Sequence, residues 1–410
     1  MTTTSYSTPF PMAPVLEPNI PDRTIHSCAF ESIQAAVDHC ASLGGGTVSV
    51  PAGTWHSGPI HLRDHIRLHL EKGAMIRFSS VPEDYLPVVF TRWEGTECYN
   101  YSPLIYAKDC HDIAVTGEGT LHGNGADWWH WKQLQQAGAD LLYQYGTENV
   151  PVEQRIFGTR EAALRPSFIQ FIACERVLME DITVLDGPQW TLHPVYCQDV
   201  TIRRVHVNTN GHNTDGLNPD SCRNVLIEDS DFYTGDDCIA INAGINKDGW
   251  RVNRPCENIV IRRCTMTGGH GGLVIGSAVS GSVRHVYAHD CRISGTMQGI
   301  RLKSMRGRGG VVEDIHFERV TIHDLSHEAI QINMFYEFST VIPKTDTPSE
   351  FQNITIRDIS GSNAAVAIQI RGLPEKKLAD ITLEHIHLTA ENSMICSDVT
   401  GLRMNDVVCE

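Results

Sequence analysis

The chain lacks the segments that mark membrane-spanning and secreted proteins. It contains no apolar run of about 18 residues, which is the shortest stretch that crosses a bilayer as a helix. Its first residues, MTTTSYSTPFPMAPVLEP, have neither the basic start nor the apolar centre of a secretory signal. We therefore expect a cytoplasmic protein without a membrane partner.

Positive charge is also scarce, with 33 Lys and Arg against 49 Asp and Glu and a formal net charge of −16. Such an excess of acid disfavours nucleic acid and anionic membranes as partners. The 13 cysteines include no Cys-x-x-Cys pair and no spacing typical of a zinc site. We expect reduced and mostly buried thiols, although the sequence leaves a few disulfides possible.

The 410 residues exceed the size of about 250–300 residues at which a single compact core stops growing. The chain therefore forms either two domains or one elongated repeat domain. Residues 1–26, rich in Pro, Ser and Thr, predict an extended tail or arm before a domain at 27–410. An amphipathic helix is expected over Glu31–Leu43, because one face carries Ile33, Ala36, Val37 and Cys40.

A short strand-like motif recurs along the rest of the chain, with a polar residue, then usually Asn or Asp, then alternating apolar residues. Its copies begin at His111, Glu175, Gln198, Arg223, Glu257, Arg284, Glu313, Gln352 and Ala379. From Asp199 on, the second residues of the copies are 25, 34, 27, 29, 39 and 27 positions apart. Leucine-rich repeats and propeller blades do not fit this pattern, whereas the short coils of a parallel β-helix do. We predict an all-β solenoid whose first coil is capped by the helix, with an insertion at about 124–165.

Four consecutive coils carry polar residues that point to one site. Asp236 and His270 both lie 12 positions after their repeat marks, and Asp215 and Arg301 both lie 16 positions after theirs. Equal phase on stacked coils predicts side chains on the same flank of the cylinder. Asp237 adjoins Asp236, so three carboxyls are expected together.

Glycoside hydrolysis needs one protonated carboxyl as an acid and one ionised carboxylate as a base or nucleophile. Three clustered aspartates repel one another, so the pKa of at least one must rise. Arg301 and Lys303 lie two apart on one strand face, and Arg306 and Arg308 follow. This basic island favours a ligand that bears carboxylates.

Four ordered motifs in these coils resemble those of the polygalacturonases, glycoside hydrolase family 28. They are Asn213-Thr214-Asp215, Gly235-Asp236-Asp237, Gly269-His270-Gly271 and Arg301-Leu302-Lys303. The segments around Arg92-Trp93-Glu94-Gly95 and Tyr101–Tyr106 resemble the bacterial exo-acting branch.

This resemblance implies a right-handed parallel β-helix that hydrolyses α-1,4-galacturonide bonds with inversion and without a metal or cofactor. It implies that Asp236 is the general acid, with His270 supporting it, and that Asp215 and Asp237 activate the water. An acid and base about 6.5–9.5 Å apart are expected for inversion. Substrate binding would fall to Asn213, Arg301, Lys303 and Tyr336.

Two positions depart from the family pattern. Leu302 replaces the usual Ile, and Asn218 stands where bacterial relatives commonly carry Asp, which leaves the finer substrate preference open. The preferred hypothesis is an exo-polygalacturonase acting on pectic oligomers, with a homo-oligomer possible. The alternatives are a hydrolase of another pectic linkage such as rhamnogalacturonan, a non-catalytic polysaccharide-binding β-helix, and a lyase on the same fold.

Overall fold

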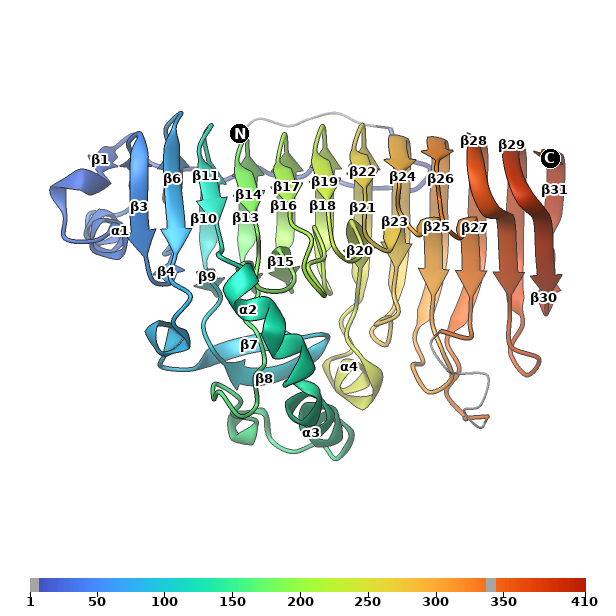
Figure 1. Ribbon diagram of the computed structural model, residues 1–410, viewed down its shortest axis with the longest axis horizontal. Coiled ribbons are helices and arrows are strands. Elements are labelled where there is room, and N and C mark those ends of the chain that lie inside the picture. Colours follow the sequence, from blue (N-terminus) through green and yellow to red (C-terminus); the bar gives the residue numbers. More distant parts are fainter. Residues whose placement is uncertain (1–6, 337–343) are drawn as a thin grey trace.

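The computed structural model describes residues 7–336 and 344–410, which form one elongated cylinder of stacked coils (Figure 1). Nearly all strand pairs are parallel, and each strand pairs with the corresponding strands of the coils before and after it. The fold is the right-handed parallel β-helix that the sequence repeat and the family resemblance predicted. Among the described residues, no helix is long and apolar enough to cross a bilayer.

Three faces run along the cylinder. The first face contains β1 (Thr24–His26), β2 (Gly46–Val50), β5 (Ile66–Leu70), β10 (His111–Thr116), β13 (Glu175–Glu180), β16 (Gln198–Arg203), β18 (Arg223–Glu228), β21 (Cys256–Arg262), β24 (Val283–Ser294), β26 (Val311–His323), β28 (Glu350–Arg371), β29 (Leu378–Ser397), β30 (Val399–Thr400) and β31 (Arg403–Cys409). The second face contains β3 (Gly53–Ser57), β6 (Ala74–Phe78), β11 (Thr120–His122), β14 (Thr183–Leu185), β17 (His206–Asn208), β19 (Asp231–Tyr233) and β22 (Thr265–Thr267), and the long strands from β24 on bend into it. The third face contains β4 (Ile60–His61), β9 (Ile105–Lys108), β12 (Ile169–Ile172), β15 (Leu192–Val195), β20 (Ile239–Ile241), β23 (Gly271–Ile275), β25 (Gln298–Lys303) and β27 (Glu328–Asn333).

The sequence repeat coincides with the coil register. Gln198 pairs with Glu175 and Arg223, and the first residues of the later copies pair in the same way along the first face. The second residue of each copy has a positive φ, as in Asp199 (55°) and Asn224 (56°). Asn and Asp tolerate this left-handed conformation better than most residues. The repeat therefore marks the corner at which each coil turns into the first face.

The interior is a continuous stack of apolar side chains contributed by successive coils. Val177, Val200, Val225 and Ile259 occupy one register position on four neighbouring coils and are fully buried. All 13 cysteines are free thiols, nine of them buried, which confirms the expectation of mostly buried, unpaired cysteines.

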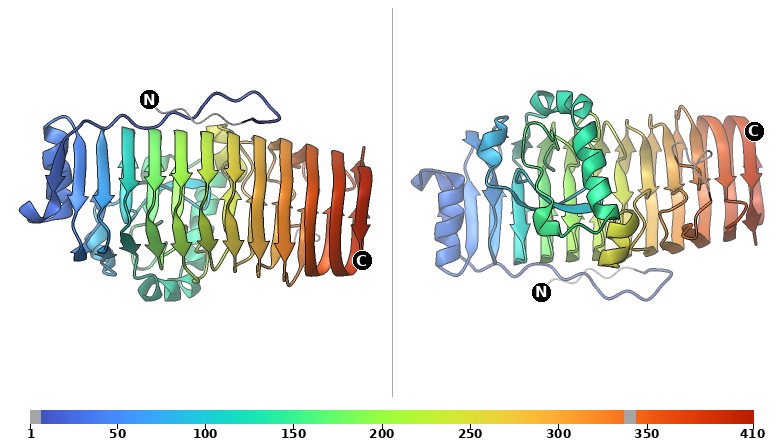
Figure 2. Two further views of the ribbon diagram at one scale, coloured as in Figure 1. Left: turned by 90° about the horizontal axis from the view of Figure 1, so that it is seen from above. Right: turned by 90° about the horizontal axis from the view of Figure 1, so that it is seen from below.

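The first coil is capped by α1 (Ile33–Ser42), whose apolar face is the one expected from the sequence. The Ser32 hydroxyl accepts a hydrogen bond from the Ala35 amide at 3.0 Å and caps the helix. An extended arm at residues 7–23, which precedes this helix in the chain, runs along the outside of the cylinder (Figure 2). Its Asn19 amide donates to Asp112 Oδ1 at 2.8 Å, and Val15 packs against Leu226 and Val260.

Two insertions and a short helix gather on the side of the third face (Figures 1 and 2). The first insertion contains η2 (Pro82–Tyr85) and an antiparallel hairpin, β7 (Val89–Trp93) and β8 (Thr96–Asn100). The second contains α2 (Ala126–Trp129), η3 (His130–Gln133), α3 (Gln136–Thr147) and η4 (Val152–Gln154). Helix α3 packs against β8 and against α4 (Asn246–Val252), so these segments form one wall beside the cylinder.

Candidate active site

A pocket of about 130 Å³ lies between this wall and the third face of the cylinder. The wall contributes Glu94, Tyr143 and Ile245 to its lining, and the coils contribute Trp190, Asn213, Asp215, Asp236, Asp237, Ala240, Asn242, Gly276, Ser277, Ala278, Lys303, Arg308 and Tyr336. Six of the eight residues singled out from the sequence therefore line one cavity. The other two, His270 and Arg301, adjoin it through Asp236 and Asp237.

The three aspartates converge because two neighbouring coils are in register at this point. A β-bridge joins Leu217 to Ile239, which places Asp215 beside Asp237 two residues earlier on each coil. One carboxylate oxygen from each of Asp215, Asp236 and Asp237 lies within 4.8 Å of the others. The turn before the Asp pair needs glycine, because a Cβ on Gly235 would lie 2.2 Å from the Gly211 carbonyl oxygen.

Each carboxyl has its own polar partner. Asn218 Nδ2 donates to Asp215 Oδ2 at 2.8 Å, and Lys303 Nζ donates to Asp237 Oδ2 at 2.7 Å. His270 Nδ1 lies 2.9 Å from Asp236 Oδ1. The contact between His270 and Asp236 confirms that their equal phase in the repeat places them on the same flank.

Burial and the hydrogen-bond partners shift the pKa values of Asp215 and Asp236 in opposite directions. Burial, together with the charges of Asp236 and Asp237, raises the pKa of Asp215 well above its ordinary value. Burial also opposes ionisation of Asp236, but its hydrogen bond with His270 and the charges of His270 and Lys303 hold its pKa below the ordinary value. The same hydrogen bond raises the pKa of His270.

The expectation that one carboxyl of the cluster has a raised pKa is therefore confirmed. The sequence reasoning gave the protonated role to Asp236, whereas the surroundings raise the pKa of Asp215 and lower that of Asp236. The reason is that Asp236 has a basic partner, while Asp215 is bonded to the neutral amide of Asn218.

The spacing of about 6.5–9.5 Å expected for an acid and a base refers to whole carboxyl groups, which lie farther apart than their nearest oxygens. The closest oxygens lie within 4.8 Å, because two of the residues are neighbours in the chain and the third lies one coil away.

Basic side chains line one side of the group. Arg301 and Lys303 share a face of β25, with Arg301 Nη1 3.7 Å from Asp237 Oδ1. The guanidinium carbon of Arg301 lies 5.7 Å, and Lys303 Nζ 5.0 Å, from the ring centre of Tyr336. Arg301 lies on the same face as Asp215, as their phase predicted, although it pairs in register with Val274 and not with the level of Asp215. The segments between strands differ in length from coil to coil, so equal phase does not imply equal register.

The basic residues at 301–308 do not all lie at the pocket. Arg308 is buried in the pocket lining and donates to Asn246 Oδ1 at 2.7 Å. Arg306 instead pairs with Glu375 outside the pocket lining. Asn213 lines the pocket, and its Oδ1 accepts a hydrogen bond from Arg165 Nη2 at 2.9 Å.

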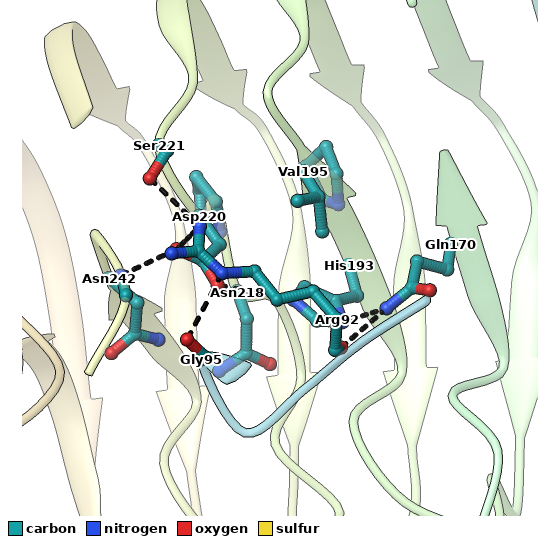
Figure 3. A network of polar contacts seen from close by, with 12 residues as sticks. Arg92, Gly95, Gln170, His193, Val195, Asn218, Asp220, Ser221 and Asn242 are labelled. Atoms are coloured by element: carbon teal, nitrogen blue, oxygen red, sulfur yellow. Dashed lines mark hydrogen bonds and ion pairs between the residues drawn. The ribbon is translucent and has the colours of Figure 1, made fainter. Parts of the chain in front are cut away.

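Sequence reasoning did not assign a role in the site to Glu94, Tyr143 or Trp190. Glu94 occurred only within a segment of family resemblance, and Tyr143 only within a predicted insertion. These residues are brought to the site by contacts between segments that are far apart in the sequence. Arg92, two residues before Glu94, is buried against the cylinder, where its Nη1 donates to Asp220 Oδ1 and Ser221 Oγ at 2.9 Å each (Figure 3).

Gln170 Nε2 donates to the Arg92 carbonyl at 2.9 Å and fixes the same hairpin from another coil (Figure 3). Since Asp220 lies only five residues after Asp215, the contacts of Arg92 join the wall to the segment that supplies one of the aspartates.

Comparison with known proteins gives consistent matches. The family model described as glycosyl hydrolases family 28 matches residues 154–409. A probable polygalacturonase of Vitis vinifera is 28% identical, over 93% of this chain and 75% of that protein. An exo-poly-alpha-D-galacturonosidase of Dickeya chrysanthemi is 25% identical, over 92% of this chain and 67% of that protein. The crystal structure of a hyperthermoactive exopolygalacturonase from Thermotoga maritima is 35% identical, with a TM-score of 0.90, and the match covers 95% of this chain and 94% of that one.

Proposed function

The chain belongs to glycosyl hydrolases family 28, and on that premise we propose that it is a polygalacturonase acting from the end of the chain. Its substrate is polygalacturonate or its pectic oligomers, and its reaction is hydrolysis of an α-1,4-galacturonide bond. The mode of action is exo, with galacturonic acid released from the non-reducing end.

The observation that carries the exo mode is the wall beside the catalytic group. Glu94 and Tyr143 line the same pocket as the three aspartates, and both come from insertions outside the coils. A chain that is cleaved internally needs sugar units on both sides of the catalytic group. A pocket closed on one side by inserted segments accommodates a chain end instead.

In the proposed reaction Asp236 donates a proton to the glycosidic oxygen, and the bond from that oxygen to C1 breaks. Asp236 suits this role because its side chain is the most exposed of the three carboxyls, at 17% against 4% for Asp237. Binding of a substrate carboxylate adds negative charge and excludes water, and both effects raise the pKa of Asp236. Asp236 then holds its proton beside the glycosidic oxygen that leaves.

Asp215 and Asp237 hold a water molecule that attacks C1 from the opposite side, and Asp237 accepts its proton. Lys303 Nζ donates a hydrogen bond to Asp237 Oδ2 at 2.7 Å and so orients this carboxyl. Arg301 and Lys303 bind a galacturonate carboxylate next to the scissile bond, because guanidinium and ammonium groups donate charge-assisted hydrogen bonds to carboxylates. His270 orients Asp236 through Oδ1.

Product analysis on trigalacturonate and polygalacturonate, in excess chelator, tests the function and its mode. Galacturonic acid present from the first time point supports exo action, and a ladder of intermediate oligomers contradicts it. New ultraviolet absorbance would indicate a lyase. Proton NMR of the first turnovers settles the stereochemistry. We expect the β-anomer, and initial formation of the α-anomer would show retention.

A further inference from the structure

Glu94 occupies an unusual position at the tip of the β7–β8 hairpin. Trp93 pairs with Thr96, so Glu94 and Gly95 form a two-residue turn, with φ of 42° and 85°. Turns of this kind favour Asn and Gly, since both residues need a positive φ. A glutamate is less suited to this left-handed backbone than Gly, Asn or Asp.

The carboxylate of Glu94 is held in a fixed orientation inside the pocket. The Tyr143 hydroxyl donates to Oε2 at 2.9 Å, and Gln189 Nε2 donates to Oε1 at 3.0 Å. Both donors are neutral. Each carboxylate oxygen can accept a second hydrogen bond, so Glu94 retains acceptor capacity at the pocket that it lines.

Burial is the largest effect on the half-buried Glu94 carboxyl and raises its pKa, against the opposing charges of Lys132 and Arg165 and the hydrogen bond from Tyr143. The charge of Asp236 acts in the same direction as burial, which agrees with the location of both carboxyls on one cavity. Such a group does not suit the carboxylate of the substrate, because like charges repel. It suits the hydroxyl groups of a sugar, which need acceptors.

The hydroxyls of a galacturonate unit differ with its place in the chain. In an interior unit, O4 belongs to a glycosidic bond and has no proton to donate. The unit at the non-reducing end has a free hydroxyl on C4, at the opposite end of the ring from the scissile bond at C1. A carboxylate on the C4 side of the bound unit therefore gains the C4 hydroxyl as a donor only when a chain end is bound.

We propose that Glu94 is the residue that selects the chain end, by accepting a hydrogen bond from the C4 hydroxyl of the terminal galacturonate. This inference rests on the proposed function and deepens it. An interior unit would place a substituted oxygen against Glu94, so the remaining acceptor position of the carboxylate would face an oxygen that cannot donate. Sites built to bond a hydroxyl discriminate strongly against ligands that lack it.

The hairpin is anchored independently of Glu94. Arg92 bonds to Asp220 and Ser221, and its carbonyl accepts from Gln170 (Figure 3). Glu94→Gly therefore removes the carboxylate while leaving these contacts in place. Glycine also adopts a positive φ without strain, so this variant should unfold at the same temperature as the natural protein or at a higher one.

The test compares two substrates, saturated trigalacturonate and the trimer whose terminal unit is 4,5-unsaturated and lacks the C4 hydroxyl. We expect the natural protein to prefer the saturated trimer by at least about 100-fold in kcat/KM. Glu94→Gly should lose at least about 100-fold on the saturated trimer, so that the ratio falls toward one. Asp109→Gly, at an exposed residue with φ of 56°, is the matched control and should keep the ratio.

Equal cleavage of both trimers by the natural protein would overturn the inference, as would an unchanged ratio in Glu94→Gly. Both results leave hydrolysis of galacturonide bonds intact. A natural protein that cleaves neither trimer nor polygalacturonate would instead refute the proposed function, and this inference with it.

Discussion

Replacing Asp215 by Asn should make the protein more stable at pH 8 while abolishing its turnover. Asp215 is buried, and its carboxylate lies within 4.8 Å of those of Asp236 and Asp237. An amide has nearly the same shape, carries no charge, and can still accept the hydrogen bond from Asn218. The substitution therefore removes repulsion without creating a cavity.

The size of the effect follows from the distance. Two unit charges 4.8 Å apart repel by about 3.5 kcal/mol at an effective dielectric constant of about 20. Lys303 and His270 offset part of this repulsion, and protonation of Asp215 relieves more of it. We expect a net gain of about 1–3 kcal/mol in the free energy of unfolding at pH 8. Since about 1 kcal/mol shifts Tm by only about 1–2 °C in a chain of this size, Tm should rise by about 1–6 °C.

The gain in stability from Asp215→Asn should increase as the pH rises. Because the folded protein raises the pKa of Asp215, the unfolded chain loses this proton first as the pH rises. Below the unfolded value of about 3.9, aspartic acid and asparagine are both neutral, and the two proteins should have similar stability. Above it, the natural protein loses stability relative to Asp215→Asn until the folded pKa is passed, and the difference then stays constant.

Urea unfolding of both proteins at pH 4 and pH 8, with the exposed Asp22→Asn as a control, measures this difference. A variant no more stable than the natural protein at pH 8 would refute the reasoning. A stability difference that narrows from pH 4 to pH 8 would do so too.

Three further outcomes are expected. Asp236→Asn should lower kcat by about 10²–10⁴-fold while calorimetry still detects binding of trigalacturonate, and retained turnover would remove Asp236 from the acid role. Arg92→Met should lower the free energy of unfolding by about 3–5 kcal/mol, because it leaves Asp220 charged and buried. The double variant with Asp220→Asn should recover part of this loss, and no recovery would show that the charge is not the cause. Thiol titration of the native protein should modify the exposed Cys28 and Cys396 first, and modification of all 13 thiols at one rate would contradict the buried thiol stack.

The sequence predicted the parts of the fold that depend on local repetition. The motif shared by Asp199 and Asn224 marks a backbone corner, so its recurrence fixed both the coil and its register. The helix at Ile33–Ser42 was predicted from its apolar face in the same way. The contact between His270 and Asp236 could be predicted because their coils have equal phase up to that point.

Other parts of the site depend on contacts that no local pattern encodes. Arg92 and Asp220 are 128 residues apart, and the sequence around neither residue indicates that the two form a pair. The antiparallel β7–β8 hairpin interrupts the repeat without replacing it by another periodic signal. The protonation of Asp215 depends on which partner each carboxyl obtains, and this is decided by side-chain geometry within the pocket.

The pair of Arg92 and Asp220 also links the two halves of the proposed mechanism. Residues 213–221 supply Asp215 to the catalytic group, and at Asp220 and Ser221 they receive the arginine that holds the hairpin. A variant that breaks this pair would thus disturb the position of Glu94 and of Asp215 together. If the double variant of Arg92 and Asp220 recovers stability without recovering turnover, the ion pair acts by positioning the wall against the aspartates. If turnover returns with stability, the pair serves folding alone, and the orientation of the hairpin is determined by Gln170 and by the contacts of α3.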